Sequence, residues 1–322
     1  MDYKLSLQLY TKLYRSRRAE QRIIDLYGEN DMKTPMHMSF GQEAVPAAVA
    51  EALAGKGDIV TSYRTHAPFL AITGDVDAFF GELYGRAAGF AEGVGGSMHL
   101  ALPERGHLIS TAIVAGGISI ATGAAFSHKR LKTGHIAVVF FGDGAVEEGA
   151  FWESINVASV MRLPVLFVCE DNGLAVHTRA SARHGFKSLQ DIIESFGGFE
   201  FAFDDSNDVE LLYSKCRTLV EHCQSGIGPA FLHAQCFRYL EHVGINSDFN
   251  RGYRSKTEMD PWLSKDCLAI QRRRLVSADL ESDVLAIEDL CGREIERAIA
   301  KAKASPAPQP ARLNAGVFHE KH

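Results

Sequence analysis

The sequence has no uninterrupted apolar run of about 18 residues, so no membrane-spanning helix is predicted. It also has no excess of basic residues: 34 Lys and Arg stand against 40 Asp and Glu, for a net charge of −6. This mild acidic balance excludes the basic surface typical of nucleic-acid-binding proteins. The N-terminus lacks the apolar core of a secretory signal, and Asp2, Glu20 and Asp25 argue against an organelle transit peptide. We therefore expect residues 1–30 to be part of the folded protein.

Cysteine is scarce, and the six cysteines form no Cys-x-x-Cys pair. Cys169 and Cys236 lie in apolar, strand-like runs, where a free thiol acts as a small hydrophobic side chain. This usage argues against a disulfide framework or a zinc site and fits a cytoplasmic location. Apolar residues make up 46% of the 322, enough to bury a large core.

Hydrophobic patterning predicts an alternation of helices and strands. Short apolar runs predict buried strands at 136–141, 165–168 and 230–237. Helical spacing predicts helices over 5–27, 43–53, 145–161, 208–223, 260–275 and 284–303. The alternation predicts an α/β fold with a doubly wound, mostly parallel sheet and helices on both faces. No linker divides the chain, so we expect one domain over residues 1–303 and an extended, proline-rich arm over 304–322.

Residues 81–123 are unusually rich in glycine and follow no simple repeat. They form either a long irregular surface loop or backbone that approaches a ligand closely, which glycine permits because it has no Cβ. The apolar pair Ile113–Val114 inside the stretch favours the second alternative. Residues 177–188 and 240–260 are polar and aperiodic, and we expect them to be mobile loops.

Two oxygen-bearing side chains follow successive predicted strands. Asp143 stands between Gly142 and Gly144 at the end of one strand, and Asn172 follows the next. Ligands of open parallel sheets bind at the carboxyl ends of the strands, so both side chains are expected to face one crevice. A carboxylate and an amide oxygen suit magnesium, and flanking glycines let the backbone approach a phosphate. This pattern predicts a clamp for a metal-bound diphosphate.

A dinucleotide-binding turn is the main structural alternative. It requires glycine at the first, third and sixth positions, and here the sixth position is Glu147. Asp143 would also repel a pyrophosphate without a metal ion. Glu170 is nevertheless placed where it could imitate the acid that binds ribose.

The run GDGAVEEGAFWESIN over residues 142–156 is similar to the thiamine-diphosphate motif. It continues to Leu163-Pro164 and Glu170-Asp171-Asn172, and it resembles in particular the alpha subunits of pyruvate, branched-chain 2-oxo acid and acetoin dehydrogenases. Further matches follow in order: Tyr14-Arg15 to Glu20, Gly41-Gln42-Glu43-Ala44, Ser62-Tyr63-Arg64, Gly95-Gly96-Ser97-Met98-His99 and the Ser305-Pro306 tail. The resemblance covers nearly the whole chain and implies a thiamine-diphosphate-binding fold.

The resemblance implies a set of residues around thiamine diphosphate and magnesium. The metal ligands would be Asp143, Asn172 and the main-chain carbonyl of Leu174. The remaining cofactor contacts would come from Tyr63, Arg64, Ala112, Val114, Gly144, Ala145 and His242. Val114 falls where the family places an apolar wedge under the cofactor, and Arg64 presents the guanidinium fork that suits phosphate oxygens.

Two histidines align with reacting groups of the family. His37 matches a histidine of the substrate pocket, and His242 matches one on a loop near the diphosphate. Both are assigned catalytic roles, since imidazole is a suitable proton donor near neutral pH.

Several positions depart from the family pattern. The acid expected four residues after His242 is absent, and Asp248 stands six residues on. Val243 occupies the place of a serine that carries regulatory phosphate in some relatives. Asp171 replaces an asparagine, and Ile118-Ser119 replaces Val-Pro, which puts a nearby cation site in doubt.

The resemblance also implies a partner, because the glutamate that activates the cofactor comes from a beta subunit in this family. We therefore expect an alpha2-beta2 assembly, with the glycine-rich surfaces and the proline-rich arm as contacts. The predicted reaction is decarboxylation of a small, pyruvate-like 2-oxo acid with acyl transfer to a lipoyl-protein. The alternatives are the same chemistry with an aldehyde, sugar or electron acceptor, as in a split transketolase, and a non-catalytic relative.

Overall fold

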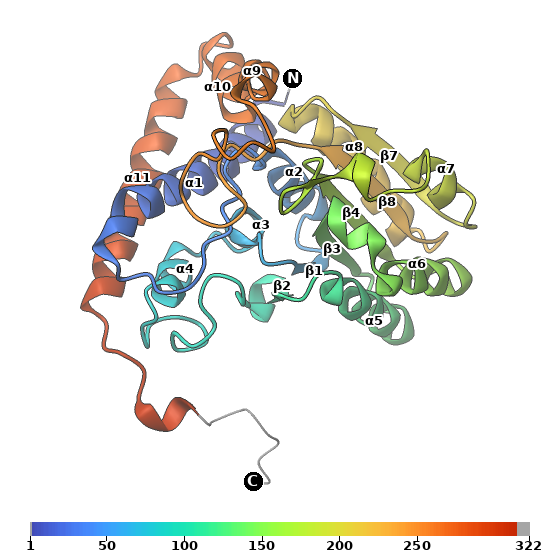
Figure 1. The fold of residues 1–322 in the computed structure, drawn as a ribbon, viewed down its shortest axis with the longest axis horizontal. Coiled ribbons are helices and arrows are strands. Elements are labelled where there is room, and N and C mark those ends of the chain that lie inside the picture. The colour runs from blue at the N-terminus through green and yellow to red at the C-terminus, as the bar shows by residue number, and fades with distance from the viewer. Residues whose placement is uncertain (1, 314–322) are drawn as a thin grey trace.

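A parallel sheet forms the centre of the computed structural model, which describes residues 2–313. Its six strands lie in the order β2-β1-β3-β4-β8-β7, and each pair of neighbours is parallel. Figure 1 shows the helices arranged around this sheet. The strands are β1 (Gly57–Thr61), β2 (His107–Ser110), β3 (Ile136–Gly142), β4 (Val165–Asp171), β7 (Glu200–Asp204) and β8 (Ala230–Gln235).

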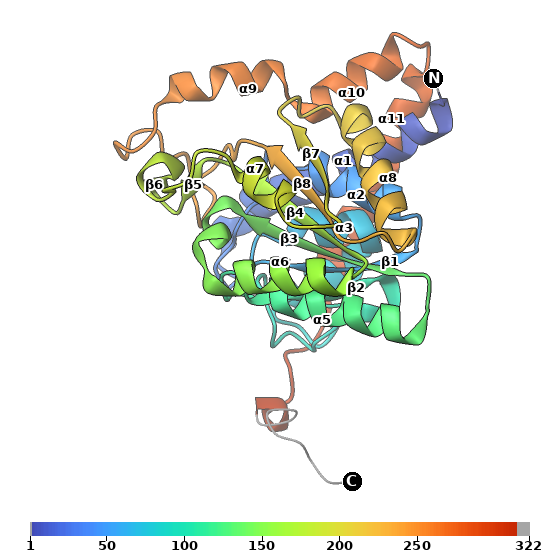
Figure 2. The same ribbon diagram turned by 90° about the vertical axis from the view of Figure 1, so that its right-hand side faces the viewer.

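The central strand β3 is buried on both faces, as its β-branched and aromatic residues predict. Ile136, Val138 and Phe140 pack in one core with α1 (Tyr3–Leu26), α2 (Ala44–Leu53) and α8 (Val209–Gln224). The residues of β3 that alternate with these three point to the other face of the sheet. They pack there in a second core with α5 (Gly116–Leu131) and α6 (Gly149–Met161). Figure 2 shows α5 and α6 side by side beneath the strands. The sequence prediction of a parallel α/β fold is therefore confirmed.

A third core lies beside the sheet, where aromatic and aliphatic residues of α1, α4 and α11 meet. Figure 1 shows α11 running along the outer side of α1, with α4 beside them, so helices from the beginning and the end of the chain pack together here. The remaining helices and a short two-stranded sheet are α3 (His66–Thr73), α4 (Val76–Leu83), α7 (Leu189–Glu194), α9 (Asp260–Ser264), α10 (Cys267–Val276), α11 (Glu281–Ala304), β5 (Leu174–Ala175) and β6 (Thr178–Arg179). None of the described helices is long and apolar enough to cross a membrane.

Several predicted elements have different limits in the structure. The helix predicted from residue 145 begins at Gly149, after a 3-10 turn over Asp143–Glu147. The helix predicted over 260–275 is broken between α9 and α10, where the side chain of Asp266 caps α10 by accepting from Ala269 N. The patterning gave no sign of α3, α4, α5 or β7.

The prediction that the glycine-rich stretch lies against a ligand is wrong for most of its glycines. The loop between α4 and β2 folds around the buried carboxylate of Glu82, which accepts backbone hydrogen bonds from Ala91, Gly93, Gly95 and Gly96. A Cβ at Gly93 would lie 2.3 Å from the carbonyl carbon of Gly85. These glycines allow the chain to approach itself, and residues 116–131 form helix α5 instead of a loop.

The predicted arm after Ala304 begins with extended backbone at Ser305 and continues into a 3-10 turn over Pro310–Leu313. Ser305 and Pro306 accept hydrogen bonds from Ala88 and Ala87, which ties the start of the arm to the glycine-rich loop. Residues 314–322 of the predicted arm lie outside the described residues. The division of the chain at residues 303 and 304 stays a prediction.

Candidate active site

A cleft of about 260 Å³ lies at the carboxyl ends of β1, β3 and β4. The order in which the chain adds strands to the sheet switches sides here: β2 lies on one side of β1, and β3 lies on the other. Such a switch point leaves a crevice between the loops that follow neighbouring strands. The cleft is lined by Gln42, Ser62, Tyr63, Arg64, Val114, Ala115, Phe141, Gly142, Asp143, Gly144, Ala145, Glu147, Glu148, Glu170, Asn172, Leu174, Ala175, Val176 and His242. Nine of the predicted site residues are in this set; Ala112 is not among these described lining residues.

Asp143 lies at the tip of β3 with its side chain almost fully buried. Burial raises the pKa of its carboxyl, the charge of Asp171 raises it further, and the guanidinium of Arg183 lowers it. Arg183 contacts both Asp143 and Glu147. An ionised carboxylate in this position is stabilised by a nearby cation.

Asn172 follows β4 and faces the same cleft. Its amide nitrogen donates to Gln42 Oε1 at 3.4 Å, and its Oδ1 accepts from the backbone nitrogen of Leu174 at 3.2 Å. An amide oxygen has two lone pairs, so Oδ1 retains the capacity to bind a metal ion. The carboxylate of Asp143 and the amide oxygen of Asn172 form the hard donor set that suits magnesium.

Arg64 is buried beside the donor set and is held by two loops. Its guanidinium donates to Met38 O at 2.5 Å and to His242 O at 3.2 Å. A guanidinium has five N–H donors, so these two contacts leave others for phosphate oxygens. Its preceding residue, Tyr63, lines the same wall of the cleft.

The rings of His37, Tyr63 and His242 form one cluster. The centroid of His37 lies 4.5 Å from that of Tyr63 and 5.3 Å from that of His242. Burial lowers the pKa of both histidines to about 3, and the positive charge of Arg64 contributes to both shifts. Each imidazole is therefore neutral near pH 7, with one nitrogen that donates and one that accepts. His37 stands behind Tyr63 and His242 and is not among the lining residues described above.

Glu170 and Gln42 line the cleft although the motif analysis gave neither a role towards a diphosphate. Burial raises the pKa of Glu170 to about 8, against the opposing effect of Arg64. Gln42 reaches the cleft from a loop distant in sequence from β4. Its hydrogen bond with Asn172 shows that it belongs to the site. Its place in the matching run Gly41-Gln42-Glu43-Ala44 was the signal available in the sequence.

Asp171, the replacement noted in the sequence, points away from the cleft that Asn172 faces. Its side chain lines a second cavity, behind Asp143, and pairs with His233 at 2.8 Å. Burial is the largest single influence and raises the pKa of Asp171, but the hydrogen bond and charge of His233 together with the backbone hydrogen bond from Gly173 lower it overall. The departure from the family pattern at this position is therefore matched by a partner on β8.

The residues present fit a magnesium-bound diphosphate. Two oxygen donors leave neighbouring strand tips, and Gly142 and Gly144 border the donor Asp143. A side chain at Gly144 would fill the turn, because its Cβ would lie 2.9 Å from Cβ of Ala175. Fold and cleft together define an α/β protein with a ligand site at the switch point of a parallel sheet and ligands suited to a hard cation.

The chain belongs to the dehydrogenase E1 component family, whose model matches residues 11–311. It is 29% identical over 314 residues to the acetoin:2,6-dichlorophenolindophenol oxidoreductase alpha subunit of Bacillus subtilis, covering 97% of this chain and 93% of that protein. It is 33% identical over 329 residues to the pyruvate dehydrogenase E1 component alpha subunit of Rickettsia typhi, covering 98% of each chain. The corresponding Zymomonas mobilis subunit is 31% identical over 324 residues, covering all of this chain and 90% of that one.

The family assignment makes this chain an oxidoreductase component of the 2-oxo acid dehydrogenase type, related to E1 alpha subunits. It confirms the resemblance found in the sequence. It also removes the dinucleotide-binding turn as an alternative.

Proposed function

We propose that this chain is the alpha subunit of a magnesium- and thiamine-diphosphate-dependent enzyme that decarboxylates a small, pyruvate-like 2-oxo acid and transfers the acyl group to a lipoyl-protein. The observation that carries the proposal is the convergence of Asp143, Asn172 and Arg64 in one cleft at the switch point of the sheet. The relatives named as pyruvate dehydrogenase E1 components support the choice of substrate.

In this proposal the carboxyl edge of the sheet holds the cofactor's charged end. Asp143, Asn172 and the carbonyl of Leu174 would bind magnesium, and Arg64 with Tyr63 would hold phosphate oxygens. The backbone of Gly144 and Ala145 would contact the diphosphate from the 3-10 turn, and Val114 would support the apolar rings. When bound, thiamine diphosphate supplies the nucleophile and the electron sink that decarboxylation of a 2-oxo acid requires.

His242 would contact the substrate as a neutral imidazole, and the catalytic role expected of His37 would be exerted through His242 and Tyr63, because His37 does not line the cleft. With a pKa of about 3, neither ring carries a charge near pH 7, so each offers one N–H donor and one acceptor nitrogen. A donor N–H beside the reacting carbonyl can hold its oxygen by a hydrogen bond. With a pKa of about 3, neither ring carries the extra proton that the role of proton donor near neutral pH requires, so the structure favours hydrogen bonding over the proton donation expected from the sequence. The edge-to-face contact of the two rings fixes His242 against His37 and leaves His242 facing the cleft.

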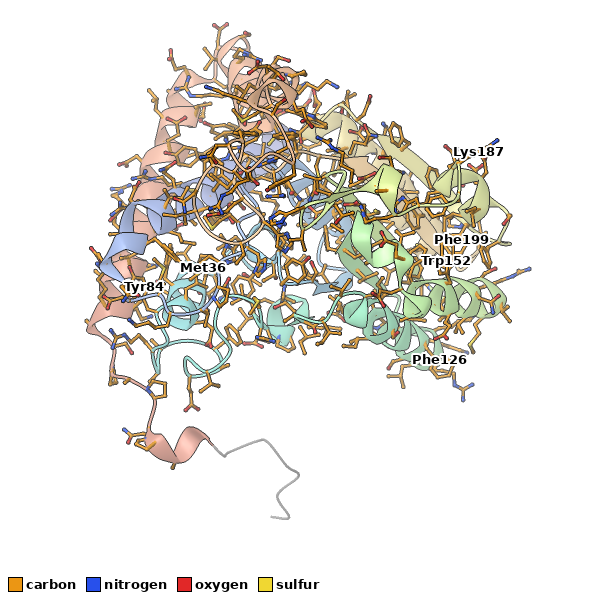
Figure 3. All side chains as sticks on the ribbon, viewed as in Figure 1. Met36, Tyr84, Phe126, Trp152, Lys187 and Phe199 are labelled. Atoms are coloured by element: carbon orange, nitrogen blue, oxygen red, sulfur yellow. The ribbon has the colours of Figure 1, made fainter. Side chains whose placement is uncertain are left out.

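A beta subunit would close the open side of this cleft. Val114 lines the cleft and is 44% exposed, while the neighbouring Ile113 is 69% exposed. These two residues lead into an apolar surface on α5 and α6, on which Phe126 is labelled in Figure 3. This surface, here called the α5/α6 face, contains the exposed residues Ile120, Phe126, Leu131, Val157, Val160 and Met161. The names of the relatives, as alpha subunits, support a beta subunit as the partner in an alpha2-beta2 assembly.

The same chemistry with a different acyl acceptor is the second candidate. The segment from His242 to Asp248 is longer than the family pattern, and it borders the cleft entrance. The relative from Bacillus subtilis is named for acetoin and a dye acceptor. Incubating the assembled enzyme and pyruvate with a lipoyl domain, an aldehyde or the dye separates the two, because only acyl-lipoyl formation supports the first. A cytoplasmic location stays a prediction from the six buried, unpaired cysteines.

Replacing Asp143 tests the metal site. With the beta subunit present, Asp143→Ala should abolish magnesium-dependent binding of thiamine diphosphate in calorimetry, because it removes the charged oxygen donor. Asp191→Ala, an exposed acid on α7, is the matched control and should bind as the wild type does. Unchanged binding by Asp143→Ala would refute the proposed function.

A further inference from the structure

Arg183 makes an unusual contact with the proposed magnesium ligand. It lies in the loop between the 3-10 turn Ala180–Ala182 and α7, and its guanidinium contacts Asp143 Oδ2 and Glu147 Oε1. The side chains of Arg183 and Asp143 are 7% and 3% exposed, so their contact is shielded from solvent, whereas Glu147 is 35% exposed and its contact lies at the surface. A bridge between an arginine and two carboxylates restricts the orientation of each of them.

The guanidinium of Arg183 is itself held in place from two sides. Its Nε donates to the carbonyl oxygen of Thr178 in β6 at 3.1 Å. Its Nη1 lies over Gly144, where an added Cβ would be 3.8 Å away. Arg183 is therefore positioned by β6 and by the same glycine turn that is proposed to contact the diphosphate.

A second side chain of the same loop reaches the turn. His184 Nε2 lies 3.3 Å from Glu147 Oε1, so adjacent residues of the loop reach the segment Asp143–Glu147. Arg179, in the same loop, points elsewhere and pairs with Glu258 and the carbonyl oxygen of Tyr253. The contact with Asp143 is thus specific to Arg183 among the arginines of this loop.

Asp143 lies close to other negative charges. Asp171 is near enough to affect its ionisation, and Glu147 shares the guanidinium of Arg183. Without a fixed cation on one side, repulsion from these acids would turn the carboxylate of Asp143 towards solvent. Arg183 binds only one of its two oxygens in the contacts described, Oδ2.

We propose that Arg183 is a positioning residue for the magnesium site: it holds Asp143 Oδ2 so that Oδ1 faces the ion, and it thereby couples metal binding to the order of loop 177–188. The inference rests on the proposed function, because it takes Asp143 as a metal ligand. Groups that orient a ligating carboxylate contribute about 10- to 100-fold to metal affinity. The positioning role therefore predicts weaker magnesium binding when Arg183 is removed.

The test titrates magnesium into the assembled alpha and beta subunits at a fixed concentration of thiamine diphosphate. Arg183→Ala should weaken magnesium binding about 10- to 100-fold. Arg183→Lys should recover part of the loss, because lysine keeps the charge but not the fork that reaches two carboxylates. Arg179→Ala is the matched control and should bind magnesium as the wild type does. Equal affinity of Arg183→Ala and wild type would overturn the inference, and so would tighter binding, which would make Arg183 a competitor of the ion.

Hydrogen exchange of the peptide 177–188 gives a readout that does not depend on activity. Magnesium and thiamine diphosphate should slow its exchange in the wild type and in Arg179→Ala, but much less in Arg183→Ala. Equal protection in all three proteins would contradict the coupling. Asp143→Ala distinguishes failure of the two proposals. If Asp143→Ala and Arg183→Ala both bind magnesium as the wild type does, the proposed function fails. If Asp143→Ala loses binding and Arg183→Ala does not, only the role of Arg183 fails.

Discussion

Arg238 and Asp248 form an ion pair of 3.2 Å inside the loop that borders the cleft, with both side chains 1–2% exposed. Asp248 also binds the guanidinium of Arg254 and the hydroxyl of Tyr253. Arg238 in turn donates to the carbonyl oxygen of Val176, which lies in the turn between β5 and β6. Arg238 thus joins the turn between β5 and β6 to the buried carboxylate of Asp248, in the polar loop that carries His242.

Removing Asp248 should loosen this region. Asp248→Ala leaves Arg238 and Arg254 buried without their shared counter-charge, which costs about 3–5 kcal/mol. Urea unfolding should show the loss, and limited proteolysis should cut residues 240–260 faster. Asp205→Asn, at an exposed acid, is the control and should leave both measurements unchanged. An Asp248→Ala protein as stable as the control would show that the two arginines find other partners.

Two neighbouring glycines should respond differently to alanine. At Gly144 a Cβ would lie 2.9 Å from Cβ of Ala175, so Gly144→Ala must displace β5, at about 1–3 kcal/mol. At Gly142 the nearest atom would be Glu170 O at 3.9 Å, an ordinary contact, and the backbone φ of −86° suits alanine. We expect only Gly144→Ala to lose stability in urea and to weaken magnesium-dependent cofactor binding in calorimetry. Equal effects at the two positions would contradict the close packing of the turn.

The paired imidazoles should make stability depend on pH. Burial first, and then the charge of Arg64, lower the pKa of His37 and His242 to about 3, below the ordinary 6.5 that they recover on unfolding. Between these values the unfolded chain binds more protons, so the free energy of unfolding should fall as the pH drops from 6.5 towards 3 and level off above 6.5. His37→Asn and His242→Asn should each reduce this slope in urea titrations at pH 5 to 7. Slopes identical to the wild type would mean that folding does not lower the pKa of either ring.

A charge on the α5/α6 face should prevent assembly. Val160 is 76% exposed on α6, and Val160→Glu would bring an unpaired carboxylate into an apolar interface, which is costly. Co-expression with the beta subunit followed by size-exclusion chromatography should yield the free alpha chain. Leu285→Glu, at a leucine 52% exposed on α11, is the matched control and should still assemble. If Val160→Glu assembles normally, the beta subunit binds a different surface.

Three of the sheet strands, β3, β4 and β8, and most long helices followed from patterning, because strands buried on both faces form continuous apolar runs and helices that bury one face repeat every 3.6 residues. The strand predicted from Ile136 and the helix predicted over 284–303 are present as β3 and α11. Helices α3 and α4 escaped prediction because they are short and buried on most sides, so they show no polar face. The glycines around Glu82 were misread because the sequence does not show whether glycine admits a ligand or another part of the chain.

The sequence by itself determined the family and predicted the two oxygen donors, since Asp143 and Asn172 follow successive strands, and parallel strands end at one edge of a sheet. Only the tertiary structure decided which side chains surround those donors. Gln42 and Arg183 come from loops far apart along the chain, and local spacing carries no record of which loops meet. The pKa values of the two histidines depend on burial and on the charge of Arg64, which arise only when these loops pack together.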